Sequence, residues 1–348
     1  MSKKNIKNYT LQDLKTELSQ AGFEKFRANQ VFRWLYKKKR ETFQDFKNLS
    51  KNLIDYLIDN FEIISLVPEN IQYSKIDATV KYTLKLLDGE IIESVIIPDR
   101  ERRTLCVSSQ AGCKMGCEFC YTGSGGWRRD LEPWEIVEQV IIAMIFLEKE
   151  SLKLTNIVFM GMGEPLDNFD NVVKALKIIV NKEGLEISPR RISVSTVGIT
   201  DKIARLIEET AVNLSVSINA PNNLVRSSIM PVNGKYPLNE LVDFIAGLNI
   251  PKRKRVVVEY VLLHGVNDST DDALQLAKLL RGFPVKVNLI PFNGFPGSRF
   301  VSPDESDMLQ FQDTLIDKGY SVFIRSSKGK DILAACGQLR GTVLNKFK

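Results

Sequence analysis

The sequence is poor in the residues that build closed metal sites, and it contains no long apolar run. It has five cysteines and one histidine in 348 residues. No stretch of about 18 apolar residues occurs, which excludes a membrane-spanning helix. The first residues, MSKKNIKNYTLQDL, include no apolar segment of the signal-peptide type, so we expect a cytoplasmic protein. That compartment is reducing, which argues against structural disulfides and favours metal or redox roles for the cysteines.

Low-complexity segments are also absent, and the composition is that of a folded globular protein. Hydrophobic residues make up 44% of the chain and charged residues 26%. The length suffices for one large domain with a smaller one beside it.

Charge is unevenly distributed along the chain. The whole sequence has 48 basic and 42 acidic residues, a net charge of +6. Residues 1–60 contain 13 Lys and Arg against 7 Asp and Glu, again +6, so the rest is balanced. The run WLYKKKRETF (34–43) sets four basic residues directly behind Trp34 and Tyr36. This favours a nucleic-acid partner for the N-terminal region, with a solvated helical surface as the alternative.

Hydrophobic periodicity divides the chain into three parts. Residues 9–61 have the pattern of short helices, and 80–90 and 91–98 that of a β-hairpin around Asp88-Gly89. From residue 104 strands and helices alternate. Strands are predicted at 104–109, 156–160, 191–196, 213–218, 255–263, 285–290 and 320–326. Helices are predicted at 133–150, 169–182, 201–209, 237–247, 271–281 and 304–318. Repeated βα units require parallel strands, hence an α/β barrel or open sheet.

Three of the five cysteines follow the first strand of this series, in SQAGCKMGCEFCYTG (109–123). Loops at the carboxyl ends of parallel strands build active sites. A disulfide needs two cysteines and a closed zinc site four ligands. Three thiolates, Cys113, Cys117 and Cys120, can bind three irons of a [4Fe–4S] cluster and leave the fourth iron open. A zinc site completed by Cys106 or His264 remains the alternative.

Other polar segments fall at the ends of later strands. FMGMGEPL (159–166) offers glycines for close backbone approach and Glu164 for a cationic group. SVSTVG, VSINAP and NLIPFNGFPG end three further strands, either as helix caps or as parts of one ligand site. Cys336, in AACGQL, is either a buried small side chain or, with Cys106, half of a redox pair.

Together these motifs resemble the RlmN/Cfr family of radical S-adenosylmethionine (SAM) RNA methyltransferases. LCVSSQAGCKMGCEFCYTG, GMGEPLDN, EYVLLHGVNDS, NLIPFNGFPG and AACGQL carry the resemblance, and GFEKFRANQVFRWLY resembles the family's accessory domain. The resemblance implies an α/β fold, a radical-SAM partial (β/α)6 barrel at 99–348 that includes a C-terminal methyl-carrier loop. It also implies a helical RNA-binding domain at 1–65 and a β-hairpin linker at 66–98.

The resemblance further implies the cofactors and the residues that hold them. A [4Fe–4S] cluster is expected on Cys113, Cys117 and Cys120. SAM contacts are expected at Gly163, Glu164, Ser195, Ser217, Ile218, Asn219 and Asn293. The family usually has Ser-Leu-His where this chain has SIN (217–219), and Asn219 can donate and accept hydrogen bonds but cannot become cationic.

The implied reaction uses two SAM molecules. Cys336 takes a methyl group from the first, and the radical from the second removes a hydrogen atom from that S-methyl group. The resulting methylene radical adds to adenine. Glu93 is the candidate base, and Cys106 releases the product by a transient disulfide with Cys336. The sequence around Pro165 favours methylation at C2 of adenine, with C8 as the alternative.

The implied partners are 23S rRNA, tRNA and an electron donor such as flavodoxin or ferredoxin, and a monomer is expected. One alternative is a non-catalytic iron–sulfur or zinc RNA-binding protein, which would need the cysteine triplet but neither Cys336 nor Cys106. Another is a radical-SAM activase or lyase, against which the basic N-terminus and ACGQL argue.

Overall fold

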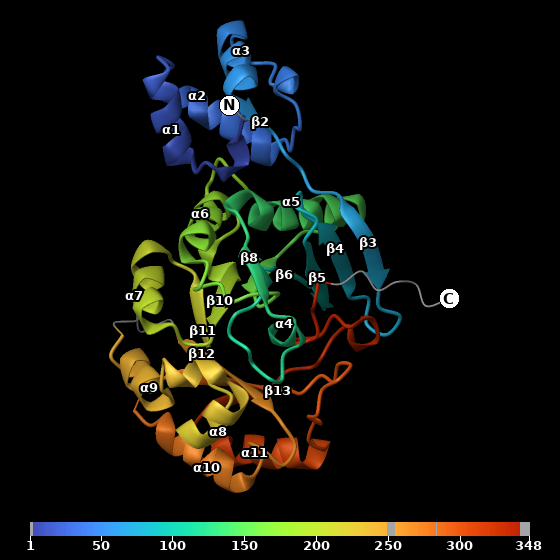
Figure 1. Ribbon diagram of the computed structural model, residues 1–348, viewed down its shortest axis with the longest axis vertical. Coiled ribbons are helices and arrows are strands. Elements are labelled where there is room, and N and C mark those ends of the chain that lie inside the picture. The colour runs from blue at the N-terminus through green and yellow to red at the C-terminus, as the bar shows by residue number, and fades with distance from the viewer. Residues whose placement is uncertain (1–2, 249–254, 283, 342–348) are drawn as a thin grey trace.

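The structure is a computed structural model that describes residues 3–248, 255–282 and 284–341. Within these residues one ten-stranded sheet forms the centre of the molecule, in the order β14-β13-β12-β11-β10-β9-β6-β5-β4-β3 (Figure 1). The edge strands β14 and β3 do not pair with each other in the described chain. The sheet is therefore an open, partial barrel, which confirms the predicted α/β class.

Seven strands of this sheet run parallel. They are β6 (Arg102–Cys106), β9 (Asn156–Phe159), β10 (Ile192–Thr196), β11 (Asn213–Ser217), β12 (Val256–Leu262), β13 (Val285–Pro291) and β14 (Ser321–Ile324). Each coincides with a predicted strand. Because all of them point the same way, their carboxyl ends meet at one edge.

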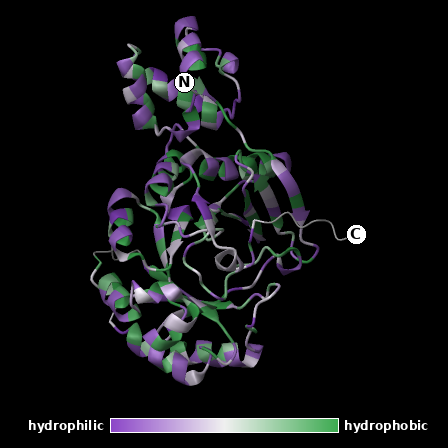
Figure 2. Ribbon diagram, in the orientation of Figure 1, coloured by the Kyte–Doolittle hydropathy of each residue, from purple (hydrophilic) through white to green (hydrophobic). Residues whose placement is uncertain are grey.

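Helices cross between consecutive parallel strands on the outside of the sheet (Figure 1). They are α5 (Pro133–Lys149), α6 (Phe169–Val180), α7 (Thr200–Glu209), α8 (Asn223–Ile229), α9 (Leu238–Ala246), α10 (Thr270–Leu279) and α11 (Glu305–Asp317). All but the short α8 were predicted. Hydrophilic and hydrophobic residues alternate along the outer helices in Figure 2, as expected for helices with one face on a sheet. No helix of the described chain is long and apolar enough to cross a membrane.

Beyond β6, toward the other edge of the sheet, the strands pair in antiparallel fashion. The predicted hairpin is formed by β4 (Val80–Lys85) and β5 (Ile91–Asp99), and β5 pairs with β6. β3 (Pro68–Tyr73) adds an edge strand that the pattern did not indicate, because PENIQY is mostly exposed and does not alternate. The hairpin thus continues the main sheet.

The N-terminal residues form a small helical unit above α5 (Figure 1). Its main elements are α1 (Leu11–Gln20), α2 (Phe26–Phe32), α3 (Lys51–Asn60) and a parallel pair of short strands, β1 (Lys4–Asn5) and β2 (Phe61–Glu62). A buried ion pair joins this unit to the sheet domain, with Lys7 Nζ 2.6 Å from Glu138 Oε1 of α5. Glu138 Oε2 also accepts from the backbone N–H of Leu66.

The basic N-terminal run is partly used for this docking. Lys37 pairs with Glu186 at 2.9 Å, and Lys39 with Glu148 at 2.5 Å. The guanidinium of Arg33 pairs with Glu183. These acidic partners lie in the sheet domain, far along the chain, so Lys37 and Lys39 also hold the two parts of the protein together. The contact of the N-terminal region with nucleic acid stays a prediction.

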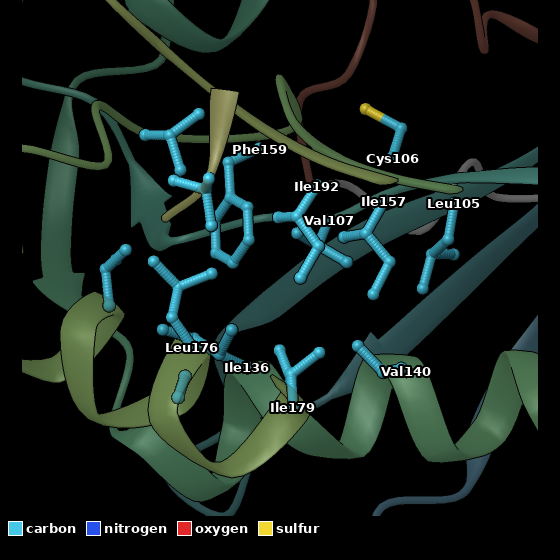
Figure 3. Packing of buried hydrophobic residues seen from close by; sticks show 14 of the residues in the cluster. Leu105, Cys106, Val107, Ile136, Val140, Ile157, Phe159, Leu176, Ile179 and Ile192 are labelled. Atoms are coloured by element: carbon cyan, nitrogen blue, oxygen red, sulfur yellow. The ribbon is translucent and has the colours of Figure 1, made fainter. Parts of the chain in front are cut away.

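Side chains on β6 alternate between the two faces of the sheet. Leu105 packs with Ile157 and neighbours toward α5 and α6, whereas Cys106 points the other way (Figure 3). This follows from the two-residue period of a strand. It aims the Cys106 thiol into the barrel interior.

Candidate active site

A cavity lies at the carboxyl ends of the parallel strands. It encloses about 960 Å³ of space, including the part open to solvent. Ten of the predicted site residues line it: Cys113, Cys117, Cys120, Gly163, Glu164, Ser195, Ser217, Asn219, Asn293 and Cys336. Ile218, Cys106 and Glu93 are not among its lining residues.

The cysteine loop connects β6 to α5 and carries a small hairpin, β7 (Gln110–Gly112) and β8 (Trp127–Asp130), with a turn of helix, α4 (Tyr121–Ser124). Gly112 has φ +77°, and a Cβ there would lie 2.0 Å from the carbonyl oxygen of Gly126. Only glycine fits. The N–H of Cys113 donates to that same carbonyl at 3.0 Å, which fixes where the first cysteine leaves the hairpin.

The thiols of this loop lie in a setting that disfavours isolated thiolates. Burial raises the pKa of Cys113 to about 12. Burial also raises the pKa of Cys117, and the neighbouring thiols of Cys120 and Cys113 add to the rise. Several thiolates can coexist here only when a cation neutralises them, so the site has the chemistry of a metal centre.

The spacing of the three thiols argues against a single zinc ion. Within residues 3–248, 255–282 and 284–341, one group of three or more possible ligands has its atoms within 4.8 Å of one another, and it is His264, Asp268 and Asp307. The cysteine triplet is spread more widely. Tetrahedral Zn–S bonds of about 2.3 Å need sulfurs about 3.8 Å apart. Cys106 and His264 do not line the cavity. The arrangement fits a larger iron–sulfur cluster.

Glu164 is buried behind two close-packed glycines that follow β9. Gly163 has φ +98°, and a Cβ there would lie 2.6 Å from Gln110 Cβ. Glu164 accepts from the backbone N–H of Leu166 at 3.0 Å and of Val197 at 2.9 Å. Burial nevertheless raises its pKa to about 7. A carboxylate held in this way attracts an ammonium group, because the cation offsets the cost of ionisation.

Asn293 presents an unsatisfied polar atom to the cavity. Its Nδ2 donates to the carbonyl oxygen of Cys336 at 3.2 Å. Its Oδ1 is buried and has no hydrogen-bond partner in the described part of the protein. A buried acceptor without a partner is costly, so this atom calls for a donor from a ligand. With Glu164 it fits the polar groups of SAM.

Two residues of the SIN segment at the end of β11, Ile218 and Asn219, use polar groups for hydrogen bonds within the protein. Asn219 has φ +56° and uses Oδ1 to accept from the N–H of Val261 at 2.8 Å, which joins β11 to β12. The Ile218 side chain is in the core, and its N–H donates to the carbonyl of Glu259 at 3.1 Å. Both groups brace the wall of the cavity, and their contact with SAM stays a prediction.

Cys336 sits on a loop that other segments hold in place by hydrogen bonds. The N–H of Tyr121 donates to the carbonyl of Gly337 at 2.7 Å. Gln338 Nε2 donates to the carbonyl of Gly294 at 2.6 Å. Cys336 is exposed through the cavity mouth. Enough protein surrounds its sulfur for burial to raise the pKa of the thiol, with the charge of Glu259 adding to the rise.

Glu93 lies on β5, beside the stretch that follows Cys336. Its Oε1 pairs with Lys81 Nζ at 2.9 Å, and both side chains are buried. Its Oε2 accepts from the N–H groups of Arg340 at 2.8 Å and Gly341 at 3.1 Å. Both carboxylate oxygens are therefore engaged, and the structure places Glu93 as an anchor of the C-terminal loop. Its role as a base stays a prediction.

Cys106 and Cys336 approach the same region from opposite ends of the chain. Burial raises the pKa of Cys106, and the nearby Cys336 thiolate adds to that rise. Cys106 is 6% exposed. The structure thus brings both remaining cysteines to one place, although only Cys336 lines the cavity.

Two charged residues at this cavity were missed by the sequence reasoning. Glu259 of β12 lines it, is buried, and accepts from Asn288 Nδ2 at 3.1 Å. A charge inside the apolar run RVVVEYVLL was the available signal. Arg226 of α8 lies behind the wall. Its segment, NLVRSSI, carried no signal that distinguished it from an exposed helix.

Comparison with known families follows the two-part architecture. A family model described as the radical SAM superfamily matches residues 107–277. A second, described as the ribosomal RNA large subunit methyltransferase N-terminal domain, matches residues 4–63. The first covers the cysteine loop and most of the parallel strands, and the second covers the helical unit.

Similarity to individual proteins extends over nearly the whole chain. The chain is 47% identical over 341 residues to "Dual-specificity RNA methyltransferase RlmN" of Geotalea uraniireducens, with 98% of each chain covered. It is 42% identical to the protein of the same name from Syntrophus aciditrophicus, with 99% of each covered. The crystal structure of a radical SAM methyltransferase from Sphaerobacter thermophilus superposes with a TM-score of 0.91 at 38% identity, covering 97% of this chain and all of that one.

Proposed function

Because the chain belongs to the RlmN family of radical-SAM RNA methyltransferases, we propose that it methylates C2 of adenosine in both 23S rRNA and tRNA. The names of its relatives, dual-specificity RNA methyltransferases, support two RNA substrates. The observation that carries the proposal is one cavity lined by both the cysteine triplet and Cys336.

Cys113, Cys117 and Cys120 hold the [4Fe–4S] cluster in this proposal. Glu164 binds the amino group of SAM, and the free Oδ1 of Asn293 takes a further donor. Gly163, Ser195 and Ser217 line the same cavity and complete the contacts, with Ile218 and Asn219 bracing the wall. When bound, the cluster supplies the electron that cleaves SAM into methionine and a 5′-deoxyadenosyl radical.

Cys336 is the methyl carrier. Its sulfur is reachable from the cavity, which a nucleophile requires and which the buried Cys106 lacks. Ring carbons of adenine are too electron-poor to attack a sulfonium methyl group, whereas a thiolate attacks it readily. Because burial raises the pKa of the thiol, its proton must be taken up as the methyl group arrives.

After the methylene radical adds to adenine, the adduct loses the proton of the ring carbon to Glu93 and one electron, which would return to the cluster. The Cys106 thiolate then attacks the sulfur of Cys336, the bond from that sulfur to the methylene carbon breaks, and this carbon takes up a proton to become the methyl group. Cellular thiols reduce the resulting disulfide. For Glu93 this role requires a rearrangement, because its Oε2 is occupied by the amides of Arg340 and Gly341. Displacement of the loop by the RNA would free that oxygen. The methyl carrier and the base would then become available together.

The helical unit is an RNA-binding domain at 1–65. It binds the RNA backbone. The linker at 66–98 joins it to the catalytic domain at 99–348. Lys37 and Lys39 pair with glutamates of the sheet domain, but Lys38 and Arg40 are exposed. We assign the phosphate contacts to these two, since exposed cations gain most from displacing counterions of the nucleic acid.

A flavodoxin or ferredoxin reduces the cluster, and the protein acts as a monomer in the cytoplasm. The reducing cytoplasm keeps Cys336 and Cys106 as thiols between turnovers. It also supplies the low-potential electron carriers that such a cluster requires.

An anaerobic assay tests the proposal. Reconstituted protein is given SAM, a reductant and either an unmodified 23S rRNA fragment or tRNA, and the digested RNA is analysed by mass spectrometry. We expect 2-methyladenosine from both RNAs with wild-type protein and none with Cys336→Ala. The C8 isomer would place the enzyme in the Cfr branch. Deoxyadenosine without methylated RNA would contradict the substrate assignment.

A further inference from the structure

Arg226 is buried at 0% exposure on α8, directly behind the cavity wall. Its guanidinium donates to the carbonyl oxygens at the ends of two adjacent strands: Val197 at 2.6 Å, Ser217 at 3.3 Å and Ile218 at 3.2 Å. It also donates to Asn233 Oδ1 and to the carbonyl of Tyr236, both at 3.0 Å. The side chain thus ties β10 and β11 together at the edge where the predicted SAM contacts lie.

All five acceptors are neutral. Within the described residues, no carboxylate forms an ion pair with Arg226. Burial of an unpaired charge costs several kcal/mol even in a relaxed protein. Burial lowers the Arg226 pKa to about 10, which still leaves the group cationic at neutral pH. A neutral side chain could donate hydrogen bonds to these strand ends at a lower desolvation cost. The positive charge of Arg226 therefore needs a separate explanation.

The cysteine loop packs directly on the helix that carries Arg226. The N–H of Glu118 donates to the carbonyl of Ile229, the last residue of α8, at 3.0 Å. Ile229 and Met230 share an apolar cluster with Cys117 and Phe119. Arg226 precedes Ile229 by one turn of α8, so the cysteine triplet with its metal centre is the anionic site on which this helix packs.

We propose that Arg226 is the buried counter-charge of the iron–sulfur site and that it favours the reduced cluster. The inference rests on the cluster assigned above to Cys113, Cys117 and Cys120. Reduction adds negative charge to a site that three thiolates already make anionic. A fixed cation in a dry, low-dielectric setting stabilises the reduced form more than the oxidised form, and so raises the reduction potential. The hydrogen bonds to Val197, Ser217 and Ile218 hold that charge in place, so Arg226 is a positioning residue.

The experiment measures the midpoint potential of the reconstituted cluster by redox titration with EPR detection, with and without SAM. Arg226→Gln removes the charge and keeps some donors, and Arg226→Lys keeps the charge but loses the fork of donors. Asn233→Asp leaves Arg226 in place and gives it an anionic partner at the position of the present 3.0 Å contact. Arg205→Gln, at an exposed arginine of α7, is the matched control.

We expect the potential to become more negative in Arg226→Gln, less so in Asn233→Asp, and to stay near the wild-type value in Arg226→Lys and Arg205→Gln. The fraction of cluster reduced at a fixed solution potential should follow the same order. Equal potentials in wild type and Arg226→Gln would overturn the proposal. If Arg226→Gln cannot be loaded with iron, an unchanged potential in Asn233→Asp overturns it instead.

Iron content and the absorbance of the oxidised cluster are recorded for every variant. Wild-type protein that binds no iron through its triplet would contradict the proposed cofactor site itself. Variants that load iron equally but share one potential contradict only the role of Arg226. A purely structural role predicts loss of thermal stability in all three variants at this site with no ordered change in potential.

Discussion

Two loops deliver cysteines to the same cavity, but they are held by different forces. The cysteine loop is packed by apolar side chains, with Cys117 and Phe119 against Ile229, Met230 and Phe292. The loop at residues 329–341 is held by hydrogen bonds to Asp77, Lys81, Glu93 and Asn293 from other segments. Cys117 is buried, and Cys336 is exposed.

The difference fits the two uses proposed for these thiols, as a metal ligand at Cys117 and as a nucleophile at Cys336. A metal ligand has to stay in one position and away from water, which close apolar packing achieves. A nucleophile that gains and loses a substituent has to be reached by one partner after another. Polar contacts can be exchanged for contacts with water or RNA at little net cost, so they suit a loop that moves.

The largest effect is expected from the packed loop. Cys117→Ala removes one of three ligands, so the cluster should fail to assemble and methylation should fall at least about 10³-fold. Iron analysis and visible absorbance check the cofactor, and RNA mass spectrometry checks the activity. A variant with full iron content would show that Cys117 is not a ligand. The apolar packing of the cysteine loop could then not be explained by metal binding at Cys117.

Cys336→Ala should abolish methylation to a similar extent, by at least about 10³-fold, but leave the cluster intact. The reason is that the C-terminal loop contributes no ligand to the triplet. Iron content, EPR spectrum and SAM cleavage without RNA are the controls. Loss of iron in this variant would mean that the cluster depends on the C-terminal loop, which accepts a hydrogen bond from Tyr121 at Gly337.

Glu93→Gln tests the polar anchoring. The amide can still accept from Arg340 and Gly341, but Lys81 loses its buried counter-charge. Breaking a buried pair costs about 3 kcal/mol, measured as the free energy of unfolding in urea. The double variant Lys81→Met, Glu93→Gln should recover part of that loss. If it regains stability without methylation, Glu93 has a chemical role besides anchoring.

The smallest effect concerns pH. Glu164 has a pKa raised to about 7 by burial, so its carboxylate fraction falls as pH drops below that value. An ammonium group binds the carboxylate, so SAM affinity should be constant above about pH 8 and fall about tenfold per unit below 7. Equilibrium binding to the loaded protein measures it. Glu164→Gln should bind weakly at every pH, and an unchanged slope in that variant would point to another group.

Local patterns predicted the parallel half of the molecule well. Apolar runs such as VKVNLI have the signature of buried parallel strands, and the structure has β13 there. PENIQY lacked such a signature because an edge strand is stabilised by pairing with β4 rather than by its own burial. Short α8 was missed because seven residues cover too few turns for a periodic pattern.

The site was predicted as a set of residues, but not as an arrangement. Motif spacing indicated the cysteine triplet, and the resemblance indicated Cys336 and Glu93. The sequence contained no sign that Glu93 would bind the amides of Arg340 and Gly341, 247 and 248 residues away. Nor did the run of lysines show that Lys37 and Lys39 would meet glutamates of the sheet domain. Such contacts depend on the tertiary fold.

The anchoring of the C-terminal loop by β4 and β5 has a consequence for how the enzyme is made. During synthesis the antiparallel strands and the cysteine loop emerge long before residues 329–341. Lys81 and Glu93 can contact the segment that carries Cys336 only after that segment has been synthesised. If the roles proposed for the cysteines hold, the iron site can assemble on a chain that is not yet able to accept a methyl group at Cys336. The enzyme can become active only after Lys81 and Glu93 have formed their long-range contacts with residues 329–341.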